Sequence, residues 1–122
     1  MILLDTNILL WHAARKDDVL TLVEETFPSD DVVLLSAVRD ELEGLADGNG
    51  KRAQKAKLAL ALASHKDLKQ VHTPFKYADD ALLHVAMETD SVVVTKDREL
   101  IQRLKVAGVT VYTPAKNNLQ RI

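Results

Sequence analysis

Short apolar runs alternate with helix-forming segments along this chain, and that alternation restricts its fold more than any other feature. The runs Ile2–Leu4 and Val92–Val94 are apolar throughout, and the second is entirely β-branched. Runs this short and this apolar are typical of strands buried on both faces of a parallel sheet. Because helix-forming segments separate the runs, the sequence predicts an α/β fold with a central, mainly parallel sheet.

Caps and breakers set the boundaries of the expected elements. Ser36 can cap a helix, Pro28 ends one, and Asp47-Gly48-Asn49-Gly50 breaks another. The expected strands cover residues 2–4, 32–35, a weak stretch around Val71, 92–94 and 109–112. The expected helices cover residues 6–14, 17–27, 36–46, 51–65, 78–89 and 98–107. The residues from Pro114 onward are expected to form a polar tail.

Length and composition exclude several classes of protein. A chain of 122 residues is expected to form one domain, residues 1–122. No apolar run approaches the ~18 residues that span a bilayer, and the N-terminus lacks the features of a signal peptide, so we expect a cytoplasmic protein. The absence of cysteine excludes disulfides and thiolate metal sites, leaving oxygen or imidazole as metal ligands. A net charge of −2 argues against a general nucleic-acid coat.

Two carboxylates follow the two apolar runs. Asp5 comes directly after the first run, and Asp97 follows the second after Thr95-Lys96. The carboxyl edge of a parallel sheet is where open α/β folds place their ligand sites. Two acids meeting there indicate a site for a hard divalent cation. The alternative for each acid is a plain helix N-cap.

Two further acids lie on predicted helices. Helical spacing puts Glu41 on one face with Val38 and Leu42, and a carboxylate within an apolar stripe needs a partner. A salt bridge to a basic residue is the alternative for Glu41. In the helix over 78–89, Asp79 lies on the flank of the apolar stripe, while Asp80 lies nearly opposite and reads as a helix-start charge.

Four segments resemble the PIN domain, the small metal-dependent nuclease fold. They are Leu3-Leu4-Asp5-Thr6-Asn7, Ser36-Ala37-Val38-Arg39-Asp40-Glu41-Leu42, Ala78-Asp79-Asp80-Ala81-Leu82-Leu83 and Val94-Thr95-Lys96-Asp97-Arg98-Glu99-Leu100. They follow the family's order and approximate spacings over nearly the whole chain. The resemblance implies a three-layer α/β/α domain. It also implies catalytic, metal-binding roles for Asp5, Glu41, Asp79 and Asp97, supported by Thr6, Asn7, Thr95 and Asp80.

The resemblance implies a ribonuclease that uses one or two Mg²⁺ or Mn²⁺ ions to activate water against an RNA phosphodiester. Two carboxylates ~4 Å apart repel by about 4 kcal/mol at an effective dielectric of 20, and a cation removes that repulsion. One branch of the family processes small-subunit rRNA, and another contains VapC-type toxins of toxin–antitoxin pairs. Expected partners are therefore RNA, a second copy in a homodimer and, for a toxin, an antitoxin protein.

Basic residues provide the candidate RNA contacts. Lys51, Arg52 and Lys55 cluster after a Gly-rich turn, and Lys96 and Arg98 lie beside the predicted site. A solvated helix face is the alternative for this cluster. Trp11 and Met87 are interpreted as core or dimer-contact residues, and the small number of aromatic residues argues against base stacking as the main binding mode.

Two other classes of protein would also gather acids at a sheet edge. A receiver-type phosphorylation switch needs an acceptor Asp at the end of a central strand, but the runs near 32–35 and Val71 end in Leu35-Ser36 and His72-Thr73. A non-catalytic, metal-binding PIN scaffold is the other alternative. A degenerate scaffold would be expected to have lost part of the acid set, which is complete here.

Overall fold

A six-stranded sheet forms the centre of the computed structural model, which describes residues 1–14 and 18–122. Its strands are β1 (Ile2–Leu4), β2 (Val32–Leu35), β3 (Lys69–Val71), β4 (Val92–Val94), β5 (Val111–Pro114) and β6 (Leu119–Arg121). They lie in the order β3-β2-β1-β4-β5-β6. All neighbouring pairs are parallel except β5 and β6. The predicted mainly parallel sheet is therefore confirmed.

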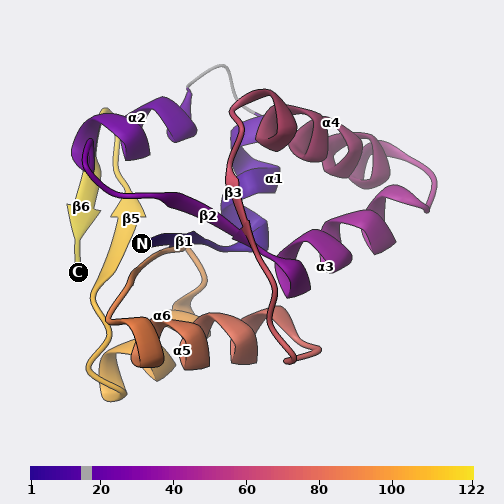
Figure 1. The fold of residues 1–122 in the computed structure, drawn as a ribbon. Coiled ribbons are helices and arrows are strands. Elements are labelled where there is room, and N and C mark those ends of the chain that lie inside the picture. The colour runs from indigo at the N-terminus through magenta and orange to yellow at the C-terminus, as the bar shows by residue number, and fades with distance from the viewer. Residues whose placement is uncertain (15–17) are drawn as a thin grey trace.

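Helices cover both faces of this sheet. They are α1 (Thr6–Ala14), α2 (Val19–Thr26), α3 (Ser36–Ala46), α4 (Lys51–His65), α5 (Ala78–Thr89) and α6 (Arg98–Val106). In Figure 1, α5 and α6 lie below the sheet, and α1, α2 and α4 lie above it. This arrangement gives the expected α/β/α layers. Within the part of the chain that the structure describes, no helix is long and apolar enough to cross a membrane.

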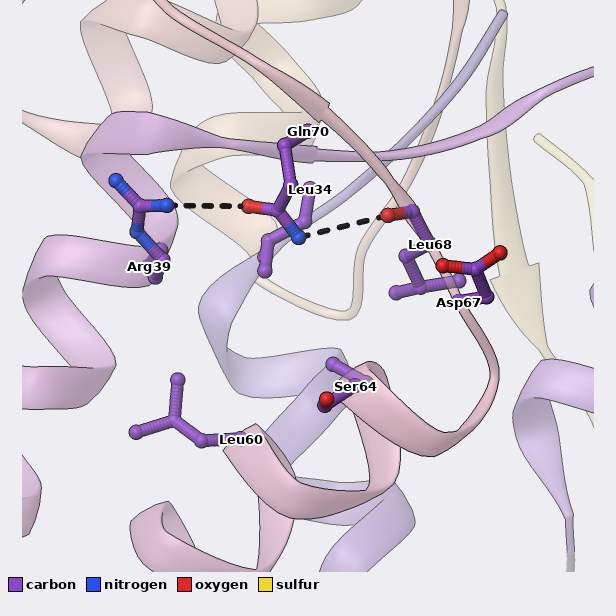
Figure 2. A pocket seen from close by; sticks show the side chains of 8 residues that line it. Leu34, Arg39, Leu60, Ser64, Asp67, Leu68 and Gln70 are labelled. Carbon is purple, nitrogen blue, oxygen red and sulfur yellow. Dashed lines mark hydrogen bonds between the residues drawn. The ribbon is translucent and has the colours of Figure 1, made fainter.

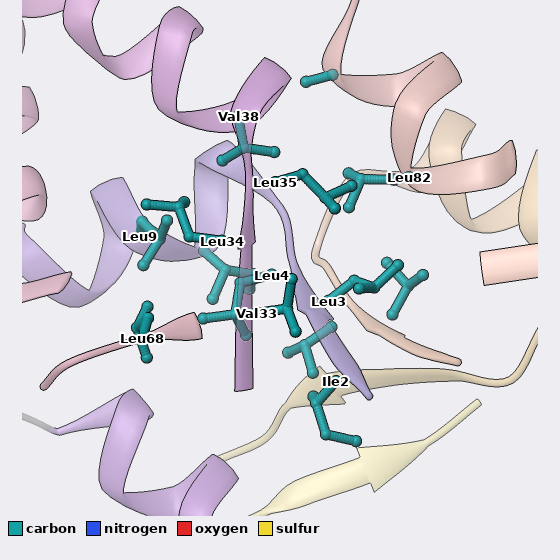
Figure 3. Close-up of a cluster of buried hydrophobic side chains, with 14 of the residues drawn as sticks. Ile2, Leu3, Leu4, Leu9, Val33, Leu34, Leu35, Val38, Leu68 and Leu82 are labelled. Carbon is teal, nitrogen blue, oxygen red and sulfur yellow. The ribbon is translucent and has the colours of Figure 1, made fainter. Parts of the chain in front are cut away.

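The central strands are enclosed on both faces, as their composition predicts. Leu3 of β1 pairs in register with Val33 of β2 on one side and Val93 of β4 on the other, and all three side chains are fully buried. Figure 3 shows Leu3 and Val33 in one cluster with side chains from the helices, including Leu9 and Leu82. Burying a Leu or Val side chain contributes about 1.5–3 kcal/mol. The core therefore fixes the strand ends where Asp5 and Asp97 follow.

The C-terminal residues differ from the prediction of a polar tail. Residues 111–114 form β5, and β6 returns antiparallel to it, with a turn closed by a 2.8 Å hydrogen bond from the Ala115 N–H to the Asn118 carbonyl. Between Pro114 and Ile122 the sequence has one large apolar residue, Leu119, and it is 7% exposed. One apolar side chain in a polar stretch gives too weak a period to predict a strand.

The starts of two elements also shift from those predicted. Helix α2 begins at Val19 because the Asp18 carboxylate caps it, accepting the Thr21 N–H at 3.0 Å; the predicted start, Asp17, lies outside the described residues. Strand β5 begins at 111 rather than 109. The α6 C-terminus continues through Gly108, at φ +78°, and the Val109 N–H donates back to the Leu104 carbonyl at 2.9 Å.

Candidate active site

The acids meet where the order of the strands reverses. β1 and β4 are neighbours in the sheet but far apart in sequence, so the chain leaves their carboxyl ends toward different elements, and such a switch point is where open α/β folds hold their ligands. Asp5 lies at this point: its N–H donates to the Val94 carbonyl at 3.2 Å, and its side chain is 2% exposed. The Thr95 hydroxyl donates to Asp5 Oδ2 at 2.7 Å. A buried carboxylate is thus held at the switch point of the sheet.

Thr95 also connects Asp5 to Asp97. The Asp97 N–H donates to the same Thr95 Oγ1 at 3.0 Å, and Asp97 Oδ1 accepts the Leu100 N–H at 3.1 Å. Asp97 is therefore the N-cap of α6, as the structural alternative predicts. Only Oδ1 is used by this bond, so capping leaves Asp97 Oδ2 as a further acceptor at the site.

Glu41 joins the site from α3, although not as its spacing suggested. The prediction that it lies within an apolar stripe is wrong, because Glu41 is exposed while its neighbours Val38 and Leu42 are buried. Its partner is the buried Thr6 hydroxyl, which donates to Glu41 Oε2 at 2.9 Å, rather than a basic residue. Thr6 directly follows Asp5, so this bond holds Glu41 beside the end of β1.

Asp79 and Asp80 have different surroundings at the start of α5. Asp80 forms an ion pair with Arg103 of α6, with 2.9 Å between Oδ1 and Nη2. Asp79 is half-buried, and the charges that act on it are chiefly those of Asp97 and Glu41. Asp79 is therefore electrostatically part of the acid set, and Asp80 belongs to a surface ion pair beside it.

The electrostatics show that these carboxylates share one region. Burial, together with the charges of Asp79 and Asp97, raises the pKa of Asp5 to about 6, although the Thr95 hydrogen bond acts to lower it. Burial also raises the pKa of Asp79, with added repulsion from Asp97 and Glu41. The charges of Asp79 and Asp97 thus act on Asp5, and those of Asp97 and Glu41 act on Asp79, which places the four carboxylates in one region.

The donor chemistry of this acid set fits a hard cation. Across residues 1–14 and 18–122, no three Asp, Glu, His or Cys side chains are grouped closely enough to hold a metal ion by themselves. Mg²⁺ does not need such a cage, since it is commonly bound by one or two carboxylates, several waters and substrate phosphates. Oxygen donors with raised pKa values, caused in part by unrelieved mutual repulsion, match that requirement.

Most of the predicted basic residues gather at one groove. A cavity of about 400 Å³ is lined by Asn7, Leu10, Trp11 and Ala14 of α1 and by Lys51, Arg52 and Lys55 of α4. The Lys96 Nζ lies 4.6 Å from the centre of the Trp11 ring. Arg98 is exposed at the first position of α6. We name this cavity the Trp11 groove.

A second groove contains residues that the sequence reasoning missed. It has a volume of about 420 Å³ and is lined by Ala37, Asp40, Glu41, Lys76, Tyr77 and Ala78. Tyr77 is 65% exposed, and the Lys76 Nζ lies 5.7 Å from the centre of its ring. The position of Tyr77 two residues before Asp79 was the available signal. We name this cavity the Tyr77 groove.

Other sequence interpretations concern residues away from the acids. Met87 is 55% exposed, so the core alternative is wrong for it and the dimer-contact alternative stays a prediction, whereas Trp11 is half-buried. A separate cavity of about 360 Å³ between β3 and α4 contains none of the predicted site residues. Figure 2 shows Arg39 and Gln70 at that cavity, joined by a 3.4 Å hydrogen bond from Nη1 to Oε1.

Comparison with known families identifies the class of protein to which this mainly parallel sheet and its acidic residues belong. The chain belongs to the PIN-domain family, since the family model described as a PIN like domain matches residues 2–114. The resemblance found in the sequence is therefore confirmed.

Individual relatives agree with this assignment. The chain is 34% identical over 110 residues to Ribonuclease VapC4 of Methanocaldococcus jannaschii, covering 88% of this chain and 84% of that protein. It is 29% identical over 108 residues to Ribonuclease VapC9 of Archaeoglobus fulgidus, covering 88% and 77%.

Two solved structures share the fold. The PIN domain endonuclease Utp24 has a TM-score of 0.81 at 23% identity, over 98% of this chain and 89% of that one. A domain of a functionally unknown Methanocaldococcus jannaschii protein has a TM-score of 0.71 at 20% identity, over 99% of this chain and 96% of that one. At these identities the likeness concerns the fold alone.

Proposed function

We propose that this protein is a ribonuclease that depends on Mg²⁺ or Mn²⁺ and hydrolyses RNA phosphodiester bonds at the acid set. The observation that carries the proposal is the buried Asp5 carboxylate at the switch point, fixed by Thr95 and acted on by the charges of Asp79 and Asp97. Membership of the PIN family and two relatives named as ribonucleases support the same conclusion.

Each acid has a separate task in this proposal. Asp5, Asp79 and Asp97 would hold the cation, and Glu41 would complete its surroundings or orient the attacking water. A divalent cation bound there supplies positive charge, which lowers the pKa of water and offsets charge developing on the scissile phosphate.

Positioning residues keep the acids in place for these tasks. Thr95 donates to Asp5 Oδ2, so the carboxylate keeps one orientation. The Thr6 hydroxyl likewise donates to Glu41 Oε2, which restricts the orientation of this exposed side chain. Asp5 and Asp79 have raised pKa values, which helps these carboxylates to take up a proton when no cation is present.

The substrate contacts are proposed to come from the basic residues around the Trp11 groove. Lys51, Arg52 and Lys55 line the groove, and Lys96 reaches it from the segment between Thr95 and Asp97. Lysine and arginine at such a groove bind the phosphates of RNA irrespective of sequence. Arg98 would add a phosphate contact beside Asp97.

We place this activity in the cytoplasm and expect the protein to act as a homodimer.

Substitution of Asp5 tests the proposal. Asp5→Asn keeps the size of the side chain and removes a carboxylate, so cleavage of RNA in Mg²⁺ or Mn²⁺ should fall by at least about 100-fold, the scale on which metal-site substitutions act. Asp30→Asn, an exposed carboxylate in the turn before β2, is the matched control and should cleave as the wild type does. Unchanged cleavage by Asp5→Asn would reject the ribonuclease proposal.

A toxin ribonuclease is the second candidate, favoured by the names of the two VapC relatives. A toxin should arrest the growth of cells that express it, and an antitoxin protein should relieve the arrest. Arrest that disappears in Asp5→Asn supports this candidate. Growth unaffected by the active wild-type enzyme contradicts it and leaves RNA processing as the function.

A further inference from the structure

The cavity between β3 and α4, which we name the Arg39 cavity, lies apart from the acid set. Its volume is about 360 Å³, and much of its lining is apolar. Leu34, Ala63 and Leu68 are buried there, and Leu60 is half-buried. A concave apolar surface bordered by a few polar groups is typical of a site for a small molecule.

Two polar side chains separate this cavity from a second one. The second cavity has a volume of about 170 Å³ and is lined by Ser36, Arg39, Gln70, Val71 and His72. Arg39 and Gln70 thus line both cavities, and Figure 2 shows the hydrogen bond that joins them. At 3.4 Å from Nη1 to Oε1 this bond is longer than most N–H···O bonds. A ligand that replaces so weak a bond gains access to the guanidinium group.

The Arg39 guanidinium has donors that the protein leaves unused. Its Nε is buried and has no hydrogen-bond partner within the part of the chain that the structure describes. Glu43 Oε1 lies 3.7 Å from this nitrogen, so the two side chains form an ion pair without a hydrogen bond. A buried donor without a partner is unfavourable, and a carboxylate can accept from Nε and a terminal nitrogen at once. The guanidinium therefore offers a place for a carboxylate.

An unpaired carboxylate lies on the other side of the cavity. Figure 2 shows Arg39 and Asp67 on opposite sides, with Leu68 beside Asp67. The nearest lysines in the sequence, Lys66 and Lys69, form ion pairs elsewhere, at 3.5 Å with the N-cap of α2 and at 3.2 Å with the residue before β2. Among residues 1–14 and 18–122, no cation pairs with the Asp67 carboxylate. This group therefore offers a place for an ammonium group.

We propose that the Arg39 cavity binds a small dipolar molecule, an aliphatic chain with a carboxylate at one end and an ammonium group at the other. The carboxylate pairs with Arg39, the ammonium group pairs with Asp67, and the chain covers the apolar lining. A simple anion would bind Arg39 but would be repelled by Asp67 and Glu43, so the second, positive group is required.

The spacing of the two charged residues sets the size of the ligand. Asp67 and Gln70 are three residues apart, and an extended chain rises ~3.3 Å per residue, so the aliphatic chain spans no more than about 10 Å. None of the carboxylates of the acid set lines the cavity. The inference therefore stands or falls independently of the proposed ribonuclease function.

Titration of the wild-type protein with 6-aminohexanoate, followed by calorimetry and by NMR of its amide groups, tests the inference. A ligand of this size is expected to bind with a Kd of the order of 1 mM. The backbone amides of residues 68–71 and the side-chain amide of Gln70 should shift, because the ligand replaces the bond between Arg39 and Gln70. Hexanoate and hexylamine each carry one of the two charges and should bind at least about 10-fold more weakly.

Two substitutions separate the two ends of the ligand. Arg39→Gln should weaken binding of 6-aminohexanoate about 10- to 100-fold, and Arg121→Gln, at an exposed arginine of β6, is its matched control. Asp67→Asn should weaken the same ligand about 10-fold but should bind hexanoate at least as tightly as the wild type does, because it removes a repelling charge. Asp67 has φ +54°, a conformation that Asn tolerates. Asp90→Asn, at an exposed aspartate with φ +51°, is the matched control.

Three results would overturn the inference. The first is the absence of shifts at residues 68–71 when the ligand is present at ten times the expected Kd. The second is an Asp67→Asn protein that binds 6-aminohexanoate as tightly as the wild type does. The third is tighter binding of an uncharged, end-blocked tetrapeptide of valine and threonine, which would assign the free edge of β3 to pairing with a protein strand.

Discussion

Replacing Asp5 by Asn should stabilise this protein while abolishing its proposed activity. In the folded protein burial and neighbouring carboxylates raise the pKa of Asp5 from 3.8 to about 6. At pH 7 ionised Asp5 therefore has a higher free energy in the folded protein than in the unfolded chain. A difference of about 2 pKa units at about 1.4 kcal/mol each corresponds to about 3 kcal/mol. Asn has no charge to bury.

The sign of the pH dependence follows from proton binding. Between pH 3.8 and about 6 the folded state binds more protons at Asp5 than the unfolded state does, so wild-type stability falls as pH rises through this window. Below pH 3.8 both states are protonated and the penalty is absent. The advantage of Asp5→Asn should therefore be small at pH 4, grow with pH and reach its full value near pH 7.

Thermal and urea unfolding in a chelator, from pH 4 to 7.5, measure this advantage. We expect about 2–3 kcal/mol at pH 7, because the Asn amide keeps an acceptor for the Thr95 hydroxyl but loses part of the hydrogen bonding to the carboxylate. For a domain of this size that corresponds to an increase in Tm of the order of 10 °C. Subtracting the two curves cancels the titrating groups that do not interact with Asp5.

Adding Mg²⁺ or Mn²⁺ provides an independent measurement on the same two proteins. A cation that binds the folded acid set raises the wild-type Tm with concentration, and the variant should respond much less. A variant that gains nothing at pH 7, or gains equally at pH 4, would refute the reasoning that Asp5 is a strained buried charge.

Three further perturbations test the surroundings of the site. Thr95→Val removes the hydrogen bond that lowers the pKa of Asp5, so that pKa should rise further and cleavage should fall about 10- to 100-fold; wild-type rates would contradict a positioning role. Lys51→Ala with Arg52→Ala should reduce the salt slope of single-stranded RNA binding by about 1.4, and an unchanged slope would make these residues ordinary surface. Burial lowers the pKa of His12 below 6.5, so its contribution to stability should decline as pH falls below 6.5, and His12→Gln should remove that decline in urea unfolding.

The apolar pattern of the sequence predicted the strands that are buried in the core. Ile2–Leu4 and Val92–Val94 became central strands with the predicted bounds because residues this apolar satisfy their burial only between two helical layers. The β5–β6 hairpin escaped prediction because its burial depends on Leu119, in a stretch that is otherwise polar. A hairpin at the edge of a sheet is determined by its tertiary neighbours more than by its own pattern.

The acidic residues could be predicted from the sequence because their positions follow from the predicted strands and helices. Their hydrogen-bond partners could not, because these depend on the tertiary structure. Asp5 and Asp97 come after strand ends, and topology brings parallel strand ends together. The Thr6–Glu41 bond joins residues 35 apart in sequence, and helical periodicity had assigned Glu41 to the buried face. Tyr77 was missed because exposure of a single ring is a tertiary property that no period records.

The acid set shows why such a site can be read from a fold of this kind. Asp97 serves α6 as its N-cap and can serve the site with its second oxygen, so one carboxylate supports both stability and chemistry. Asp5 does the opposite, since its burial is costly and only a bound cation or a proton relieves it. A carboxylate that weakens the free protein is explained by function, whereas a carboxylate that also caps a helix is explained equally well by structure. Asp5 is therefore the residue of this set that most strongly indicates an ion-binding site.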